Sequence, residues 1–351
     1  MNILLTGGSG HIGSFATAHL LSQGHGVRVV DRVAPDDINP EAAERIQGAA
    51  YVQVDITNFA ALRPHFDGIE GVVHLAAIPD PISGKDAEIF HINCGGSFNV
   101  YQAAAETGAK RVVSASSINA LGNGYGIKPV PIQYFPIDEA HPGYTTDVYS
   151  FSKQILEEIA AYFWRREGIS GACLRFPWVY NVAWFERWRG DAGDFQAHRR
   201  AAFDALMALP ETERREQAAS MMAQLQTLRE RHERGEVSEE IMHEEFQKIP
   251  IAMLVFGRND FWAMLDVRDA ALAIEKALLA EYEGNHPLWI VSDHNSVGLP
   301  TMDLASLMYP DVTTWTRPVP ETESLVSIDK AHELIGFKPE HTFMGLSLIH
   351  I

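Results

Sequence analysis

The chain has 351 residues, 46% of them hydrophobic and 21% charged, and its formal net charge at pH 7 is −18. This composition is typical of globular proteins and excludes a disordered or fibrous chain. The acidic excess argues against a nucleic-acid backbone or an anionic membrane surface as the main partner. No apolar run reaches the ~18 residues of a membrane-spanning helix, and no secretory signal precedes the first glycine loop, so we expect a cytoplasmic protein.

Two cysteines, Cys94 and Cys173, exclude a disulfide framework. The histidines form no cluster with cysteines at the spacing of metal ligands, so we expect no metal site.

The N-terminal residues predict one β-α-β unit. Residues 2–6 are typical of a short buried strand, residues 14–22 of a helix, and residues 27–30 of a second strand. The loop between the first strand and the helix carries Gly7, Gly10 and Gly13. Glycine gives such a turn its φ freedom, lets a pyrophosphate approach the backbone and allows close packing of helix on strand. Free N–H groups at the helix start would bind the phosphates of a dinucleotide.

Asp31 ends the second strand, 18 residues after Gly13. A carboxylate at this position accepts hydrogen bonds from the adenosine ribose of NAD and would repel the 2′-phosphate of NADP. We therefore expect NAD, with NADP the less favoured cofactor. The neighbouring Arg32 would stack on the adenine or, as the alternative, neutralise a 2′-phosphate.

Strands and helices continue to alternate along the chain. Strands are expected at residues 51–56, 71–77 and 111–117, and a helix at residues 93–105. Such alternation predicts an α/β protein with a doubly wound, parallel sheet of the Rossmann type. Ligands of such a sheet bind at the carboxyl ends of the strands, where Gly7, Asp31, Asp55, Ala76 and Ser117 fall.

Tyr149 and Lys153 form a YxxxK pair at the start of a predicted helix, which Thr146 or Asp147 would cap. Their spacing places the phenol and the ammonium on one helix face. A nearby cation lowers the pKa of a phenol, so Tyr149 would serve as general base or acid for an alcohol or ketone. Ser117 would orient the substrate oxygen, with Ser116 and Ser114 as rivals.

In chain order these residues resemble the extended short-chain dehydrogenase/reductase family, also called the NAD-dependent epimerase/dehydratase family. The resemblance extends over nearly the whole chain. It implies bound NAD, hydride transfer at a secondary alcohol of a small-molecule substrate, and a homodimer formed through the helices of Asn93 and Tyr149. It also implies that Asp55 and Ile56 contact the adenine, that Asn93 orders the site, and that Ser117, five positions before Gly122, is the catalytic serine.

The expected cofactor site combines the glycine loop with residues at later strand ends. It comprises Gly7, Gly10, His11, Ile12, Gly13, Asp31, Arg32, Asp55, Ile56, Leu75, Ala76, Ala77, Asn93, Tyr149, Lys153 and Phe176.

The sequence departs from the family pattern in the region that would contact substrate. Ile118 and Asn119 stand where sugar-nucleotide dehydratases carry an Asp-Glu pair, so dehydration is not expected. Trp178 stands where epimerases carry an asparagine that holds phosphate, and Asn259 replaces an arginine. These changes favour a substrate smaller than a nucleotide sugar. The candidate substrate residues are Pro79, Ser116, Asn119, Trp178 and Arg187.

Residues 186–248 form a predicted helical insertion in the substrate lobe. A helix is expected from residue 195 to 209, a second after Pro210 with an apolar stripe of Met221, Met222, Leu225 and Leu228, and a third capped by Ser238. The insertion would be a packed elaboration or, alternatively, a lid or subunit contact.

The expected domains are a Rossmann domain over residues 1–177, to which 262–293 return, and a substrate lobe over 178–261 and 294–351. The expected function is NAD-dependent hydride transfer at a secondary alcohol of a sugar-like or other small hydroxy or keto compound. The alternatives are a sugar epimerase that works through a keto intermediate and a catalytically idle NAD-binding protein on the same fold.

Overall fold

A computed structural model describes residues 1–182, 195–233, 236–238, 240–241, 244–245 and 252–341. Its main sheet has, within these residues, seven parallel strands in the order β3-β2-β1-β4-β5-β6-β9. The strands are β1 (Asn2–Thr6), β2 (Gly26–Asp31), β3 (Ala50–Gln53), β4 (Gly71–His74), β5 (Arg111–Ser117), β6 (Ser170–Phe176) and β9 (Asn285–Trp289). Strand order reverses between β1 and β4, which is where a doubly wound sheet opens a ligand crevice. The expected α/β Rossmann architecture is confirmed.

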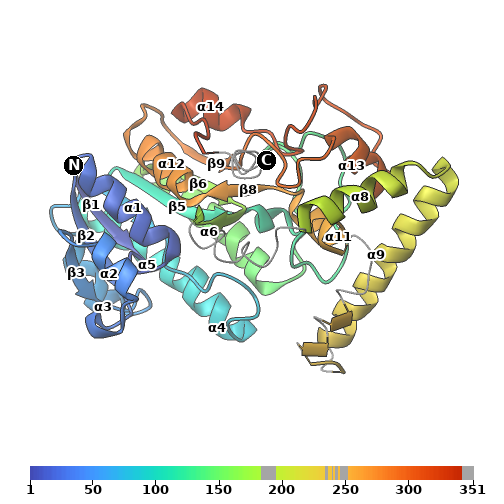
Figure 1. Cartoon of the computed structure of the whole chain (residues 1–351). Helices are drawn as coiled ribbons and strands as arrows, with labels where there is room; N and C mark the ends of the chain where they lie inside the picture. Colours follow the sequence, from blue (N-terminus) through green and yellow to red (C-terminus); the bar gives the residue numbers. More distant parts are fainter. Residues whose placement is uncertain (183–194, 234–235, 239, 242–243, 246–251, 342–351) are drawn as a thin grey trace.

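Helices cover both faces of this sheet (Figure 1). Buried residues of α1 and α12 pack on one face together with α14, and those of α5 and α6 pack with α3 on the other. The bounds are α1 (His11–Ser22), α2 (Pro40–Arg45), α3 (Phe59–Leu62), α4 (Asp86–Phe90), α5 (Ser97–Thr107), α6 (Val148–Glu167), α12 (Val267–Leu279) and α14 (Asp329–Ile335).

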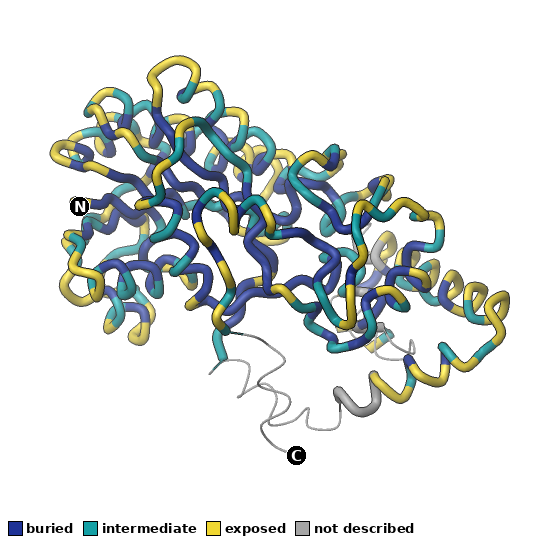
Figure 2. Tube along the Cα trace, turned by 90° about the horizontal axis from the view of Figure 1, so that it is seen from above, coloured by how far each residue is buried: buried dark blue, intermediate teal, exposed yellow. Residues whose placement is uncertain are grey.

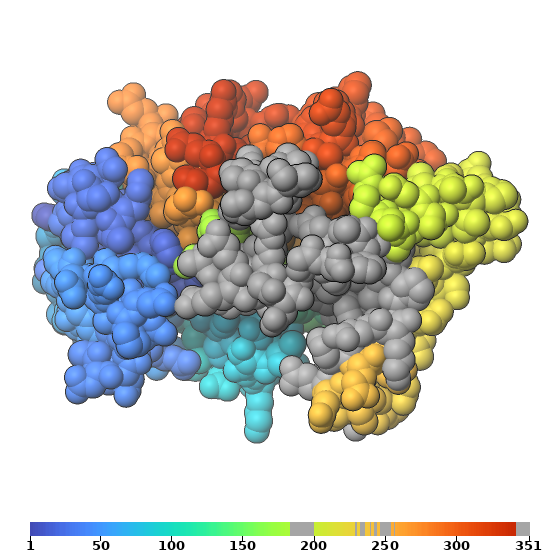
Figure 3. Space-filling view, viewed as in Figure 1, coloured from blue at the N-terminus to red at the C-terminus, as the bar shows by residue number. Residues whose placement is uncertain are grey.

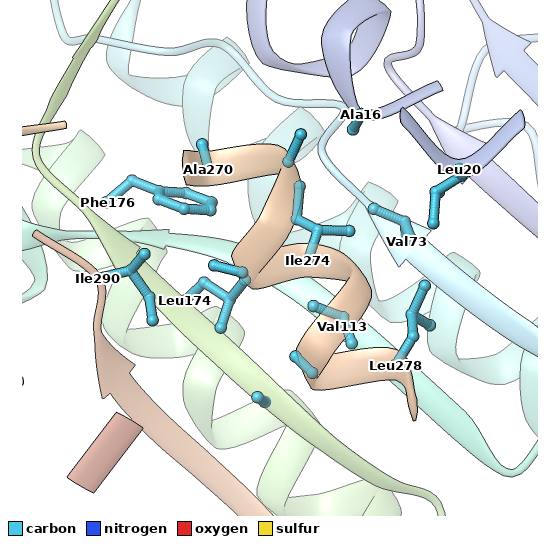
Figure 4. Packing of buried hydrophobic residues seen from close by; sticks show 14 of the residues in the cluster. Ala16, Leu20, Val73, Val113, Leu174, Phe176, Ala270, Ile274, Leu278 and Ile290 are labelled. Carbon is cyan, nitrogen blue, oxygen red and sulfur yellow. The ribbon is translucent and has the colours of Figure 1, made fainter. Parts of the chain in front are cut away.

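Helix α12 is the element that returns to the sheet late in the chain. Its apolar residues Ala270, Ile274 and Leu278 lie over β6, β5 and β4 and against α1 (Figure 4). All three are almost fully buried, which is why the helix stays on the sheet despite its distance in sequence. Buried strands and their covering helices form the interior seen in Figure 2.

The helices α8 (Phe195–Met207), α9 (Glu211–Glu233), α11 (Ala252–Gly257) and α13 (Thr301–Met308) lie at the other end of the molecule (Figures 1 and 3). A two-stranded parallel sheet of β7 (Trp178–Tyr180) and β8 (Met264–Asp266) adjoins the main sheet, because Val179 and Leu265 pack in the same cluster as α1 and α12. A second hydrophobic cluster, which includes Phe203, Leu254, Trp262 and Leu304, joins these helices. Much of α9 faces solvent (Figure 2), while Met221, Met222 and Leu225 pack against this cluster and Leu228 is buried, as the apolar stripe predicted.

Several boundaries differ from those expected. β3 and β4 end at Gln53 and His74, because the following residues leave the sheet and line a cavity at its edge. The helix expected from residue 93 begins with a π-helical turn, His91–Gly96, that joins α4 to α5. In the insertion, α8 and α9 confirm the first two helices, and the Ser238 hydroxyl caps the third by accepting from the N–H of Ile241 at 3.3 Å. Among the described residues, no helix is long and apolar enough to cross a membrane.

Candidate active site

The glycine loop after β1 is packed so closely that side chains are excluded from it. Gly7 has φ +76°, and a Cβ there would lie 2.7 Å from the backbone nitrogen of Ala76. A Cβ on Gly13 would lie 2.0 Å from the carbonyl oxygen of Gly7. The first turn of α1 is therefore held against the end of β1, with an open cradle in front of its N–H groups. Such a cradle fits the pyrophosphate of a dinucleotide.

Asp31 is buried at the end of β2 and is held by the same loop. Its Oδ2 accepts hydrogen bonds from the backbone N–H of Ser9 at 3.0 Å and the Ser9 hydroxyl at 2.7 Å, and its Oδ1 from the N–H of Val33 at 3.3 Å. The carboxylate thus fixes the glycine loop while it lines the cavity. Ser9 was missed by sequence reasoning, although its place between two glycines beside the end of β2 was a usable signal.

Asp55 lies at the next strand end along the edge. Burial would raise the pKa of its carboxyl, but hydrogen bonds from the backbone N–H and hydroxyl of Thr57, at 2.8 and 2.7 Å, together with nearby Arg32, lower it. Asp55 is therefore held ionised. Its neighbour Ile56 is buried against Gly96, where a Cβ would meet the isoleucine side chain at 2.5 Å.

Ser117, Tyr149 and Lys153 meet on the far side of the same cavity. Ser117 ends β5, and Tyr149 and Lys153 project from the first turns of α6. The helix is capped by Asp147, whose Oδ1 accepts from the N–H of Ser150 at 2.8 Å, so the cap is Asp147 rather than Thr146. The Ser117 hydroxyl hydrogen-bonds the Tyr149 phenol.

The rival serines have other partners. Ser116 donates its hydroxyl to Glu157 at 2.6 Å, and Ser114 pairs with the phenol of Tyr101 at 2.9 Å. The serine whose hydroxyl faces Tyr149 is therefore Ser117.

The pKa values of Tyr149 and Lys153 differ from those expected from the sequence. Burial raises the pKa of Tyr149, and the hydrogen bond with Ser117 opposes this shift without reversing it. The Lys153 ammonium does not contact the phenol: it donates to the carbonyl oxygen of Ala115 at 2.8 Å and lies 5.6 Å from the tyrosine ring centroid. Burial lowers the pKa of Lys153 to about 8. The expected lowering of the phenol pKa is thus wrong for this structure, because desolvation outweighs the distant cation.

Asn93 joins α6 to the loop after β4. It lies in the π-helical turn, accepts from the N–H of Ile78 at 2.8 Å and donates to the Ile78 carbonyl at 3.1 Å and to the Ser152 hydroxyl at 3.0 Å. Ser152 in turn donates to the carbonyl of Tyr149 at 2.7 Å. Asn93 therefore orders the site without lining the main cavity; it borders a small crevice behind Lys153.

A second buried network, absent from the sequence predictions, centres on His74 at the end of β4. Its Nδ1 lies 2.8 Å from the hydroxyl of Thr6 and its Nε2 lies 2.9 Å from the hydroxyl of Ser97. Ser97 donates its own proton to the carbonyl of Asn93, so it accepts from His74, whose proton is therefore on Nε2. Burial lowers the pKa of His74 to about 3 and keeps the ring neutral. From the sequence alone, a histidine in an apolar strand that links two hydroxyl groups by hydrogen bonds cannot be told from one that is only packed in the core.

One cavity of about 2010 Å³ is lined by the glycine loop, by the strand-end residues and by Ser117, Tyr149 and Lys153. The candidate residues that line it are Gly7, Gly10, His11, Ile12, Gly13, Asp31, Arg32, Asp55, Ile56, Leu75, Ala76, Ala77, Pro79, Ser116, Ser117, Asn119, Tyr149, Lys153, Phe176 and Trp178. Arg187 lies outside the described residues. No group of three His, Cys, Asp or Glu side chains that would hold a metal occurs in the part of the chain that the structure describes.

Comparison with known proteins agrees with this geometry. Residues 3–186 match the model of the NAD dependent epimerase/dehydratase family. A UDP-glucose 4-epimerase of Mus musculus is 31% identical over 172 residues, which are 45% of this chain and 47% of the mouse protein. An L-arabinose 1-dehydrogenase (NAD(P)(+)) of Haloferax volcanii is 28% identical over 186 residues, 51% of this chain and 68% of that protein. The chain thus spans about half the length of the first curated relatives that it matches.

Among solved structures, the UDP-glucose 4-epimerase of Thermotoga maritima with UDP-glucose superposes with a TM-score of 0.60. The match covers 99% of this chain and 97% of that one, at 22% sequence identity. At this identity the likeness establishes the shared fold.

Proposed function

This chain belongs to the NAD-dependent epimerase/dehydratase family, and from that premise we propose that it is an NAD-dependent oxidoreductase that transfers hydride at a secondary alcohol or ketone. The observation that carries the proposal is the meeting of Ser117, Tyr149 and Lys153 at one side of the cavity whose other side is the glycine cradle. A dinucleotide held by the cradle would reach the phenol within a single chamber.

NAD is the proposed cofactor, held by the glycine loop, Asp31, Asp55, Ile56, the Leu75–Ala77 segment and Lys153. The support is the cradle that any Cβ would fill and the buried carboxylate of Asp31 beside it. A 2′-phosphate would face this carboxylate, which disfavours NADP. When bound, NAD accepts a hydride from an alcohol carbon or returns one to a ketone.

The chain's own residues handle the proton. In ketone reduction, Ser117 donates a hydrogen bond to the substrate oxygen and Tyr149 delivers its phenolic proton to that oxygen as the hydride arrives. The raised pKa of Tyr149 keeps the phenol protonated and suits this direction. In alcohol oxidation the reacting form is the Tyr149 phenolate, which the Lys153 ammonium on the same helix face would stabilise. The phenolate takes the hydroxyl proton and becomes the neutral phenol.

A screen of secondary alcohols with NAD, followed at 340 nm, tests this function. We expect NADH to accumulate with at least one substrate class and to fail with Tyr149→Phe. Absence of turnover across the screen, combined with absence of NAD binding, would show that the proposal is wrong.

The second candidate function is a sugar epimerase, favoured by the 31% identity to a UDP-glucose 4-epimerase. An epimerase returns the hydride to the same substrate, so it interconverts two sugars with no net NADH. Conversion of UDP-glucose to a second sugar nucleotide without absorbance at 340 nm would favour this alternative over the oxidoreductase.

A homodimer is the proposed assembly. Aromatic side chains of α4, α5 and α6 are exposed on one side of the sheet: Phe90 at 42%, Phe98 at 38%, Phe151 at 44% and Tyr162 at 37%. They stack in pairs, Phe90 on Phe151 and Phe98 on Tyr162, which presents a flat apolar surface to a second copy. We expect the molar mass in solution to fall to that of a monomer for Phe151→Asp and to stay that of a dimer for the control Met302→Asp. A monomeric parent protein would contradict this assembly.

The division into a Rossmann domain over residues 1–177 and 262–293 and a substrate lobe over 178–261 and 294–351 is likewise a proposal. Two hydrophobic clusters cover the faces of the main sheet, and most of their residues belong to the proposed Rossmann domain. Most residues of the cluster that contains Trp262 belong to the proposed substrate lobe. Limited proteolysis that removes the lobe while NAD binding survives would support this division. Loss of the lobe and of NAD binding in one cooperative step would contradict it.

For a cytoplasmic location the support is the two buried cysteines, Cys94 and Cys173, whose thiols are free.

A further inference from the structure

The cavity continues well beyond the space that a cofactor needs. Its volume of about 2010 Å³ is at least twice the ~300–1,000 Å³ of an ordinary ligand pocket. The additional wall comes from the insertion and α11. Its apolar part is Met222, Leu225 and Leu228 of α9 with Val255 of α11, and its polar part is Gln226, Ser238 and Glu240. The insertion is therefore part of the chamber that contains Tyr149.

This wall is built on packed structure. Leu228 and Val255 are buried, and Met222 and Leu225 rest on the cluster that contains Phe203, Leu254 and Trp262. The neighbouring positions Gln224 and Thr227 are exposed, whereas the apolar stripe of α9 lines the cavity together with Gln226. A preformed apolar wall loses little conformational entropy when it receives an apolar ligand.

Apolar side chains also line the chamber near the phenol. Tyr125 packs edge-on against the Tyr149 ring, with centroids 5.7 Å apart, and Ile127 and Val148 line the same chamber. Trp178, which is 53% exposed, lines the chamber as well. Apolar contacts thus extend from the reacting group to the insertion.

The charges along the lining do not suit a polyanion. Among the described lining residues, the Lys and Arg side chains are Arg32, Lys153 and Arg258. Lys153 bonds Ala115, and Arg258 donates its Nε to the carbonyl of Met308 at 2.8 Å while its guanidinium lies 4.3 Å from the ring centroid of Tyr309. Six acidic side chains share the described lining: Asp31, Asp55, Asp86, Asp147, Glu240 and Asp260. The pyrophosphate of NAD would be held by the N–H groups of the glycine loop. A second diphosphate, beyond that loop, would face Asp86, Asp147, Glu240 and Asp260 against Lys153 and Arg258.

We propose that the substrate is an uncharged secondary alcohol or ketone carried on a hydrocarbon body that extends from Tyr149 to the apolar wall of α9. This inference rests on the proposed oxidoreductase function and narrows its substrate class, from small hydroxy and keto compounds in general to apolar ones. The alcohol or ketone oxygen contacts Ser117 and Tyr149, and the hydrocarbon body lies against Met222, Leu225 and Leu228.

A homologous series of alkan-2-ols, from butan-2-ol to decan-2-ol, tests the inference with NAD as oxidant. Tyr149 first releases its phenolic proton to solvent; the carbinol hydrogen then leaves as hydride to NAD while the hydroxyl proton goes to the Tyr149 phenolate, which yields the 2-ketone and NADH. Burial of each added methylene should raise kcat/KM about threefold until the wall is filled. Free hexoses, hexuronates and UDP-glucose should be poorer substrates than the longer alcohols.

Two matched variants compare a substitution on the cavity-lining face of α9 with one on its exposed face. Leu225→Asn places a polar amide on the wall and should flatten the dependence on chain length, whereas Thr227→Asn, on the exposed face of the same helix, should retain it. An unchanged NAD dissociation constant and recovery of the dependence in Leu225→Met would show that the loss in Leu225→Asn is not a folding defect.

The outcomes distinguish the inference from the function on which it rests. Lack of NADH with every alcohol, together with lack of NAD binding, would remove the proposed function. NADH formation that does not depend on chain length in the parent protein, that is fastest with sugars or sugar nucleotides, or that keeps its chain-length dependence in Leu225→Asn would overturn the inference and leave the function intact.

Discussion

The two sides of the cavity are built on different physical principles. On the cofactor side, polar side chains are tied into hydrogen-bond networks: Asp31 holds Ser9, and His74 links Thr6 to Ser97. On the insertion side, the lining includes a stripe of apolar residues, among them Leu225 and Leu228. A hydrogen-bond network tolerates little change, whereas an apolar wall accepts substitutions of similar volume. We therefore expect substitutions on the cofactor side to cost more activity than substitutions of similar volume on the insertion side.

The largest expected effect is at the reaction centre shared by the two sides. Tyr149→Phe removes the phenolic proton and keeps the ring, so we expect kcat to fall by about 10²–10⁴ while the dissociation constant of NAD stays within a few-fold. Steady-state rates and an NAD titration measure the two quantities. If kcat were retained, Tyr149 would not be the residue that transfers the proton, and the reaction would not take place beside its phenol.

The next largest effect is the pH dependence of the free energy of unfolding that His74 causes. The folded chain keeps His74 neutral down to about pH 3, whereas the unfolded chain protonates it near 6.5. The unfolded state therefore binds more protons between these values, and stability falls as pH drops below 6.5. By pH 4 this residue should account for a loss of about 3 kcal/mol in the free energy of unfolding.

Urea unfolding of His74→Gln at pH 7 and pH 4 checks this prediction. The variant should be less stable than the parent at pH 7 but should lose about 3 kcal/mol less on going to pH 4. His332→Gln, on the exposed surface of α14, is the matched control and should follow the parent. Parallel pH profiles for His74→Gln and the parent would show that the ring is not held neutral by burial.

The smallest expected effect is on cofactor choice. Asp31→Asn removes the negative charge that would face a 2′-phosphate, so the ratio of kcat/KM with NADP to that with NAD should rise about 10–100-fold. Asp36→Asn removes an exposed charge from the following loop and should leave the ratio unchanged. An unaltered ratio in Asp31→Asn would place the adenosine ribose elsewhere on the cofactor side.

Local patterns predicted which residues line the glycine-loop side of the cavity. The glycine spacing, Asp31 and the strand ends are short-range features, and parallel strands bring them to one edge by topology alone. The N-cap Asp147 and the four-residue spacing of Tyr149 and Lys153 are also local, so the catalytic helix was predicted with its residues on the correct face.

Features that depend on long-range packing were not predictable from the same patterns. The proton position on His74 follows from Ser97 and Asn93, and the contact of Lys153 with Ala115 follows from the depth of α6 against β5. The direction of the Tyr149 pKa shift was wrong for this reason: burial is a property of the assembled site. The apolar stripe of α9 was recognised, but its place on the cavity depends on how α9 packs against α11 and α13.

The most direct test of the central claim is to follow the hydrogen itself. A secondary alcohol that carries deuterium on the carbinol carbon is incubated with the protein and NAD, and the reduced cofactor is examined by mass spectrometry. The account predicts one deuterium in each reduced cofactor molecule, formed at a rate about 10²–10⁴-fold lower with Tyr149→Phe. Reduced cofactor without deuterium, or equal rates for the two proteins, would contradict hydride transfer assisted by Tyr149.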